Sequence, residues 1–306
     1  MRAAALGIFA SLVAVPALAC ADAHLDSTGH GVKVVATTTQ IGAIVREVAG
    51  DEVELTVLLK AGDDSHSYDP SPQAVVKVAD ADLILKNGIG LDDWLDGMLE
   101  GGEGRVVVVT EGIELREDGD HNEDEHAHAH EDDPHVWHNP QLAKVMVDNV
   151  VAALTEADPG KAAVFAERGD AYNAKLDATD VEIQALIDTI LPANRKVVTN
   201  HDAFGYFLDH YGLEFVGAVI PTPNKDAQAS AKELAELQDL LASEDVPAIF
   251  AEAEVDPKVA KELAHDSGVK VVEGLYADSL GPPGSGADTI DGMLLFNARK
   301  FAEGLK

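Results

Sequence analysis

The sequence of 306 residues has little of several features that mark particular classes of protein. It contains one cysteine, Cys20, so the chain cannot form an internal disulfide. Lysine and arginine number 22 against 55 aspartates and glutamates, and the net charge of -33 repels phosphate backbones and anionic lipid surfaces. Nucleic acid is therefore excluded as a partner. Most acidic side chains are spread over predicted helix surfaces, which indicates a solubility adaptation.

Motifs of common hydrolases are also missing. No H-E-x-x-H occurs, and the nearest string, HEDDPH at 130–135, has the wrong spacing and a proline that would interrupt a helix. Neither a glycine-rich phosphate loop nor a nucleophile elbow is present. These absences argue against a metallohydrolase, an alternative that hydrolytic activity dependent on His201 would revive.

The only long apolar run lies at the N-terminus. One arginine precedes an uncharged stretch that ends in small residues, so residues 1–19 are predicted to be an export signal peptide. A helix from Ala3 to Ala19 would measure about 25 Å, short of the roughly 30 Å hydrocarbon core of a bilayer. No other segment of the sequence is long and apolar enough to cross a membrane. We therefore expect an exported protein, either periplasmic or tethered to the membrane.

Cys20 directly follows Ala17-Leu18-Ala19, where a signal peptide would be cut. Two interpretations compete: A-x-A cleavage by the ordinary signal peptidase, or lipid modification of Cys20 as in bacterial lipoproteins. Alanine at the third position before the cysteine is a weak fit to the lipoprotein pattern, where leucine is usual. The lone cysteine at the cleavage point favours lipidation, because a buried structural cysteine is uncommon so close to a chain terminus.

Strand-like runs alternate with helical patterns, one of which is 91–100, along most of the chain. The expected strands are 33–39, 53–59, 82–87 and 105–110 in the first half, and 196–200, 214–220, 248–253 and 270–276 in the second half. Such alternation is typical of parallel sheets with helices on both faces. The predicted fold class is therefore α/β, with two lobes that each hold a parallel sheet flanked by helices.

The middle of the chain has no strand pattern between Pro140 and about Leu191. Its second helical run, from Lys161 to Leu191, would be about 46 Å long as an unbroken helix, which suits a rod that connects two lobes. We predict an N-terminal α/β lobe over 20–158, a connecting helix over 159–191 and a C-terminal α/β lobe over 192–306.

Residues 115–133 form a compositionally biased segment with nine carboxylates and four histidines. Because it has almost no apolar side chains to bury, we expect a mobile surface loop. Its histidines alternate with carboxylates and offer several weak N/O chelating combinations: His121, His126, His128 and His130. We predict a weak secondary metal site here, and a solvated linker without a function is the alternative.

Three residues of metal-binding types follow predicted strands: His66 on the loop after 53–59, and His201 and Asp278 just after the ends of their strands. Ligands of doubly wound α/β folds bind beyond the carboxyl ends of parallel strands, so these side chains fall where such a crevice would lie. Each alone is a weak signal, because a histidine after a strand is often a hydrogen-bonded loop residue and an aspartate there often caps a helix. Only their combination indicates a site.

A fourth candidate lies between the acidic segment and the helical pattern that begins near Pro140. His135 and His138 compete for this place, and their spacing does not choose between them. Their neighbour Trp137 offers a large apolar surface that can pin the segment and exclude water. Three neutral imidazoles and one carboxylate suit a tetrahedral Zn²⁺ site with no position left for water. Such a site would hold a metal ion rather than hydrolyse a substrate.

Four segments together carry a family resemblance. They are D-x-H-x-Y-x-P-x-P at 64–72, D-P-H-x-W at 133–137, N-H-D-A-F-G-Y-F at 200–207 and Y-A-D-S-L-G at 276–281. In these segments, and over nearly all of the mature sequence, the chain resembles the zinc and manganese solute-binding proteins of bacterial ABC transporters. The resemblance implies a non-enzymatic protein whose two lobes, joined by one long helix, clamp a metal ion with little hinge motion.

Carried over position by position, the resemblance implies a ligand set of His66, His135, His201 and Asp278. The third ligand of this set is His201, where many manganese-selective members of the family have glutamate. The histidine therefore points to the zinc-type branch, the high-affinity zinc uptake binding proteins. Histidine-rich acidic loops before the second ligand are also typical of that branch. Mn²⁺ stays open as the alternative metal.

The resemblance also implies a partner, an ABC transporter permease in the membrane, and we expect the chain to be a monomer. A surface adhesin is a further role suggested for members of this family, and no feature of the sequence supports it. Two positions depart from the family pattern. Ser65 stands where proline is common, and His138 stands where leucine is usual, so a surplus imidazole is expected near the site or at the surface.

Overall fold

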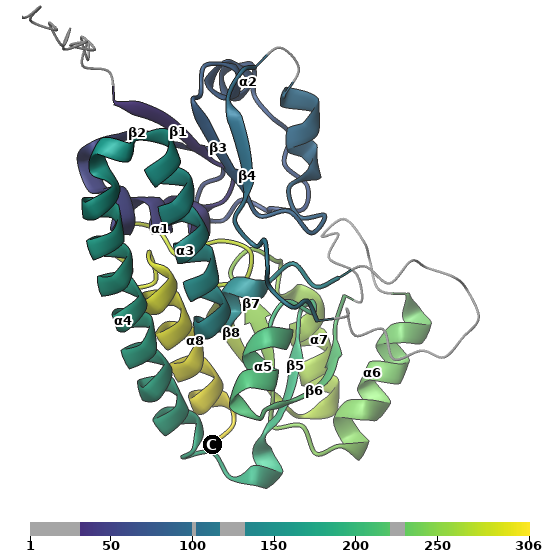
Figure 1. Ribbon diagram of the computed structural model, residues 1–306. Helices are drawn as coiled ribbons and strands as arrows, with labels where there is room; N and C mark the ends of the chain where they lie inside the picture. Colours follow the sequence, from purple (N-terminus) through teal and green to yellow (C-terminus); the bar gives the residue numbers. More distant parts are fainter. Residues whose placement is uncertain (1–30, 100–101, 117–131, 221–229) are drawn as a thin grey trace, which may run out of the picture. The chain divides into compact units, whose positions relative to one another are not determined.

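The computed structural model describes residues 31–99, 102–116, 132–220 and 230–306, which form two parallel sheets of four strands each (Figure 1). The first sheet has the order β2-β1-β3-β4, with β1 at Val32–Ala36, β2 at Val53–Val57, β3 at Leu83–Lys86 and β4 at Arg105–Val108. The second has the order β6-β5-β7-β8, with β5 at Lys196–Thr199, β6 at Glu214–Ala218, β7 at Ala248–Glu252 and β8 at Lys270–Leu275. The predicted α/β fold class is confirmed.

Helices cover both faces of the first sheet. On one face lie α1 (Thr39–Ala49) and α3 (Pro140–Ala157), and on the other α2 (Pro72–Ala79) and the 3-10 helix η2 (Asp93–Met98). Successive side chains of a strand point to opposite faces, so Val34 packs with the α1 and α3 cluster while Val35 packs with the α2 cluster.

The second sheet is covered in the same way. On one face lie α6 (Ala231–Ser243) and α7 (Lys258–Ser267), and on the other α5 (Gly205–Tyr211) and α8 (Ile290–Gly304). Val198 points toward the first pair of helices, whereas Val197 joins the cluster on the opposite face. In that cluster Phe207 of α5 stacks on Phe301 of α8, with their ring centroids 5.2 Å apart.

The helix α4 (Ala162–Ile187) lies within the predicted connecting helix and is 26 residues long, about 39 Å. It packs against α1 and α3 beside the first sheet and against α8 beside the second (Figure 1). One buried apolar cluster continues through these helices, and it includes Phe165, Tyr172 and Leu176 of α4. The described residues between 31 and 306 form one compact unit, and the lobe boundaries at 158 and 192 stay a prediction.

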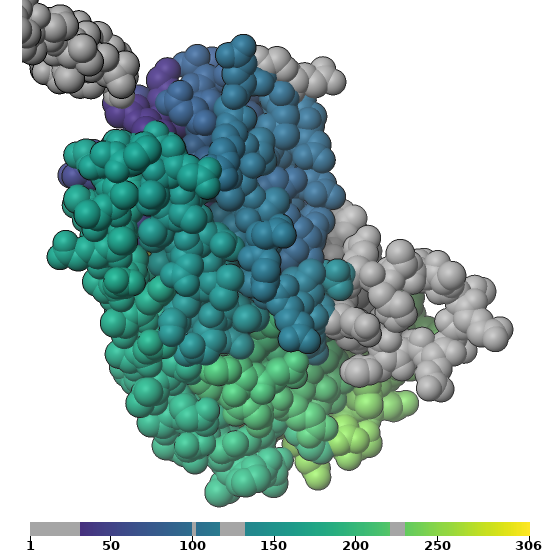
Figure 2. Space-filling model, in the orientation of Figure 1, coloured from purple at the N-terminus to yellow at the C-terminus, as the bar shows by residue number. Residues whose placement is uncertain are grey.

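The space-filling view agrees with this shared packing. On the face that Figure 2 draws, the blue surface of the first sheet's elements directly adjoins the teal surface of α3 and α4. The teal surface in turn adjoins the green surface of the second sheet's elements. Separating the two sheets would expose the apolar cluster that is now buried among the helices they share.

Local sequence explains where several helices begin and end. The Thr38 hydroxyl accepts a hydrogen bond from the Ile41 N–H (3.3 Å) and caps α1, which ends at Gly50 with a positive φ of 56°. Asn139 caps α3, whose first residue is Pro140. The carboxylate of Glu233 and the hydroxyl of Ser230 form a capping box at the start of α6.

Two expected elements differ from the observed ones. The strand expected over 33–39 ends at Ala36, because Thr38 serves as the cap of α1 instead. The helical pattern at 91–100 forms the 3-10 helix η2 rather than an α-helix. Its aspartates and Gly97 favour α-helix weakly, so the segment makes only short turns. No helix in the described part of the chain combines the length and apolar character needed to cross a bilayer.

Candidate metal centre

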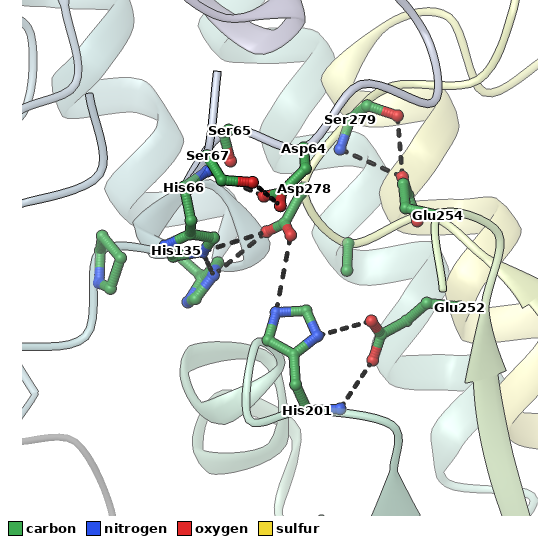
Figure 3. Close-up of polar contacts among 12 residues, drawn as sticks. Asp64, Ser65, His66, Ser67, His135, His201, Glu252, Glu254, Asp278 and Ser279 are labelled. Carbon is green, nitrogen blue, oxygen red and sulfur yellow. Dashed lines mark hydrogen bonds and ion pairs between the residues drawn. The ribbon is translucent and has the colours of Figure 1, made fainter. Parts of the chain in front are cut away.

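The structure brings together the four side chains His66, His135, His201 and Asp278 (Figure 3). Each offers one possible ligand atom, and these atoms all lie within 4.8 Å of one another. His66 lies in the loop between β2 and α2, His135 just before the 3-10 helix η3 (Val136–His138), His201 just after β5, and Asp278 just after β8. The site therefore lies at the carboxyl ends of strands from both sheets.

The Asp278 carboxylate lies at the centre of the cluster. Its Oδ1 is 3.2 Å from Nε2 of His135 and 3.6 Å from Nε2 of His66. Its Oδ2 is 3.7 Å from Nε2 of His201. All three imidazoles thus present the same ring nitrogen to one point, and the Nε2 atoms of His66 and His135 are only 3.2 Å apart.

Buried carboxylates hold two of the imidazoles from behind. Oδ1 of Asp133 accepts hydrogen bonds from the backbone N–H (2.9 Å) and the Nδ1 (2.7 Å) of His135. Glu252, at the end of β7, uses both oxygens: Oε1 accepts from the backbone N–H of His201 (3.2 Å) and Oε2 accepts from its Nδ1 (2.5 Å). A proton on Nδ1 leaves the Nε2 lone pair free to bind a metal ion, so both carboxylates fix the useful tautomer.

The loop that carries His66 is fixed by its own side chains. Asp64 accepts hydrogen bonds from the backbone N–H of His66 (2.9 Å) and the hydroxyl of Ser67 (2.7 Å). The indole N–H of Trp94 donates to the carbonyl of Ser65 (2.9 Å), which ties the loop to η2. These bonds hold the segment although Ser65 stands where the family pattern often has proline.

Residues of the first half of the chain hold the segment around Asp278. The Gln40 amide donates to the Asp278 carbonyl (3.1 Å), and the indole N–H of Trp137 donates to the Ala277 carbonyl (3.1 Å). The backbone N–H of Gly62 donates to the Ser279 hydroxyl (2.9 Å). Trp137 is fully buried beside His135, so it both pins the segment and excludes water, as its position in the sequence suggested.

His138 does not join the cluster. Its Nε2 faces the Ala277 carbonyl (3.2 Å), and its ring lies against Phe204 with a centroid distance of 4.7 Å. Its Nδ1 is buried without a hydrogen-bond partner among the described residues. Burial and the positive charge of His135 lower the pKa of His138 to about 3. The surplus imidazole is therefore a neutral core residue next to the site.

Negative charge around the cluster favours the protonated form of two of its imidazoles. Burial alone would lower the pKa of His135, but hydrogen bonds and negative charge from Asp133 and Asp278 raise it to about 9. Burial likewise opposes protonation of His201, yet the charges of Glu252 and Asp278 raise its pKa well above the usual value. A cation that enters must replace these protons, so binding is coupled to proton release.

Comparison with known proteins identifies the family. Residues 34–304 match the model of the family described as "Zinc-uptake complex component A periplasmic" (ZnuA). The chain belongs to this family. The ZnuA family consists of solute-binding proteins of ABC transporters, so the chain is a metal-binding, extracytoplasmic component of such a transporter and not an enzyme. The metallohydrolase alternative is thereby excluded.

Proteins similar to this chain have been named for manganese. The "Manganese ABC transporter substrate-binding lipoprotein PsaA" of Streptococcus anginosus is 29% identical over 309 residues, which cover 98% of this chain and 97% of PsaA. The "Manganese-binding lipoprotein MntA" of Halalkalibacterium halodurans is 28% identical over 299 residues, with 96% of each chain covered.

Solved structures show the same fold. The periplasmic zinc binding protein TroA from Treponema pallidum matches with a TM-score of 0.81 at 30% identity, over 90% of this chain and 99% of TroA. The Mn-bound periplasmic metal binding protein from Candidatus Liberibacter asiaticus matches with a TM-score of 0.79 at 26% identity, over 89% and 99% of the two chains. The fold of this chain is thus similar to that of proteins described with either metal.

The sequence pointed to all four clustered residues and to Trp137 beside them, but it did not reveal the supporting roles of Glu252 and Gln40. Glu252 ends a buried strand, AIFAE, where a charged residue is unusual, and this was the one available signal. Gln40 lies in the first turn of α1 and carries no sequence signal for its role. His121, His126, His128 and His130 lie outside the described residues, as does Cys20.

Proposed function

We propose that this chain captures Zn²⁺ outside the cytoplasm through His66, His135, His201 and Asp278, and delivers it to the permease of an ABC importer. One observation carries the proposal: three Nε2 atoms and one carboxylate converge within 4.8 Å in a mostly buried cluster. Three imidazoles and a carboxylate match the ligands and coordination number that Zn²⁺ prefers. Because imidazole donors suit zinc better than they suit manganese, the donor set favours zinc.

Mn²⁺ is the second candidate, and two observations favour it. Relatives that match almost the whole chain are named for manganese. Both oxygens of Asp278 face the imidazoles, so the carboxylate could supply two donors and raise the coordination number. A harder, higher-coordinate site suits Mn²⁺ better than a tetrahedral one.

Titration calorimetry on chelator-stripped mature protein would separate the two metals. We expect one tight Zn²⁺ site per chain after residues 117–131 are deleted, and weaker binding of Mn²⁺ in direct competition. If Mn²⁺ displaced bound Zn²⁺ when both ions were present at equal concentrations, Mn²⁺ would be the metal that the site prefers. Binding of neither ion would contradict a transport function.

Ligand variants would test the site itself. His66→Ala, His135→Ala, His201→Ala and Asp278→Ala should each lower the affinity sharply, because each removes one donor atom. His265→Ala is the matched control, since His265 is exposed on α7 and is not one of the four clustered residues. Near wild-type affinity in all four ligand variants would contradict the assignment.

Three further proposals concern parts outside the described residues and the state of the protein. We propose that residues 1–19 are removed, and that Cys20 carries a lipid that holds the protein at the membrane, a state that the names of the lipoprotein relatives support. Mass spectrometry of the protein from membranes would detect this lipid.

The histidines of 117–131 are proposed as a weak secondary zinc site. A deletion of this segment that leaves both the zinc stoichiometry and zinc uptake at low concentration unchanged would refute this site. The protein is proposed to act as a monomer, which light scattering would test.

A further inference from the structure

Arg116 and Asp133 are joined by several contacts. The backbone N–H of Asp133 donates to the Arg116 carbonyl (3.0 Å). The Tyr206 hydroxyl accepts from the Arg116 N–H (2.8 Å) and donates to the Asp133 carbonyl (2.9 Å). The Arg116 guanidinium lies 3.6 Å from Oδ2 of Asp133. These contacts fix both residues of the pair relative to each other.

The same guanidinium reaches residues of the second sheet. Its Nε donates to Oδ2 of Asp209 in α5 (2.8 Å), and its Nη1 lies 3.8 Å from Oδ2 of Asp202, which directly follows His201. Gly205 leaves room for this arrangement, because a Cβ at that position would overlap the guanidinium. Arg116 therefore lies between the segments that carry His135 and His201.

Asp133 divides its two oxygens between different partners. Oδ1 holds His135 through its backbone N–H and its Nδ1, while Oδ2 faces Arg116. The Asp133 side chain is fully buried. A buried carboxylate is stable only when charge and hydrogen bonds compensate it, and here Arg116 supplies the permanent positive charge.

We propose that Arg116 is a positioning residue of the metal centre, which acts through Asp133 to aim Nε2 of His135 and ties this histidine to the segment after His201. This inference rests on the proposed function. Without the guanidinium, the buried Asp133 carboxylate would have no permanent positive charge beside it. It would then leave the position in which it holds His135, and the imidazole would no longer be fixed toward Asp278.

A double-mutant cycle measured with Zn²⁺ and Co²⁺ alone tests this role. The variants are Arg116→Met, which keeps the length of the apolar stem, Asp133→Asn, and the two together. Arg105→Met is the matched control, because the Arg105 side chain forms an exposed ion pair with Glu156, and no other partner of it is found among the residues that the structure describes. Affinity comes from competition with a chromophoric chelator, and melting of the metal-free proteins shows that each variant folds.

We expect Arg116→Met to lower Zn²⁺ affinity about tenfold or more, the range typical for partners of metal ligands. The same substitution should cost little more in the Asp133→Asn background, because the two residues act through one contact. The absorption spectrum of bound Co²⁺, which reports the geometry around the ion, should change in the same way in both single variants. Arg105→Met should leave affinity and spectrum unchanged.

The inference would be overturned, while the proposed function stands, if Arg116→Met had unchanged Zn²⁺ affinity. It would also be overturned if the fold-loss of affinity in the double variant equalled the product of the fold-losses in the two single variants. A lower melting temperature with unaltered affinity and Co²⁺ spectrum would also overturn it, because that result describes a purely structural residue. A wild-type protein that binds no divalent ion would overturn the proposed function, and the role of Arg116 with it.

Discussion

The side-chain amide of Gln40 donates a hydrogen bond to the backbone carbonyl of Asp278, although the two residues are 238 positions apart in the sequence. Gln40 is fully buried in the first turn of α1, beside the first sheet. Asp278 follows the last strand of the second sheet. The carboxylate at the centre of the cluster is therefore held in place partly by the other half of the chain.

Replacement of Gln40 by leucine should weaken metal binding about tenfold, as loss of a supporting partner commonly does. Leucine fills a similar volume but leaves the Asp278 carbonyl without this donor, so the Asp278 loop loses its fixed position. Competition with a zinc chelator would measure the change. Gln184→Leu is the control, because the Gln184 amide donates to the exposed Asp188, the residue that follows the end of α4, and to no other group in the described part of the chain. Equal affinity in Gln40→Leu and the wild type would contradict this role.

Glu252→Gln should lower zinc affinity by about 10- to 100-fold. The amide keeps the size of the side chain but removes the negative charge behind His201, and its NH₂ group can turn toward the imidazole. His201 would then be less basic and less firmly oriented. Glu244→Gln, at a surface pair with Lys196, should leave affinity unchanged when measured in the same competition assay. A loss of the same size in this control would point to a general effect of charge.

Metal affinity should rise with pH up to about 9. His135 of the metal-free protein has a pKa raised to about 9, so below that pH the metal ion must displace its proton. Calorimetry in buffers of different ionisation enthalpy should therefore show proton release near pH 7. A binding enthalpy that is the same in all buffers would contradict this coupling.

The raised pKa of His135 also predicts how metal-free stability depends on pH. A histidine of the unfolded chain loses its proton near pH 6.5, whereas the folded protein keeps it up to about 9. This contribution to the free energy of unfolding is full below about 6.5 and is lost as the pH rises through about 9. The melting temperature of metal-free protein should fall over that interval, and bound zinc should remove much of the dependence.

His138→Leu should stabilise the fold and leave metal affinity unchanged. The buried Nδ1 has no hydrogen-bond partner among the described residues, and such a group costs about 1–3 kcal/mol. The pKa lowered to about 3 also means that the unfolded chain binds a proton below about pH 6.5 while the folded protein does not. As the pH falls from 7 to 5, this histidine therefore lowers the free energy of unfolding by about 2 kcal/mol. The leucine variant would not lose this stability.

Denaturant unfolding at both pH values would measure the effect of His138→Leu. The control is His265→Leu, since His265 is exposed on α7 and should not show the pH-dependent gain. A His138→Leu variant that is destabilised at pH 5, or that binds zinc more weakly, would mean that the imidazole serves the site.

The fold class and the place of the cluster could be predicted because they follow from local patterns. Apolar runs of strand length alternate with amphipathic helices, which leaves parallel sheets as the arrangement that buries both faces. His66, His201 and Asp278 each follow such a strand, and parallel strands end at the same edge of their sheet. At 91–100 the spacing of apolar residues predicted an α-helix, but the segment Asp93–Met98 forms a 3-10 helix. Spacing alone does not show that its aspartates and glycine have low α-helix propensity.

The sequence by itself determined two α/β halves and the candidate ligands His66, His201 and Asp278, since strand periodicity and residue type are local properties. It left His135 and His138 as alternatives, and only the family resemblance favoured His135. Only the tertiary structure decided which carboxylates and amides support those ligands. Glu252 lies 51 positions from His201, and Gln40 lies 238 positions from Asp278. A hydrogen bond depends on distances of about 3 Å between atoms, and only the packing of the two sheets against their shared helices fixes such distances.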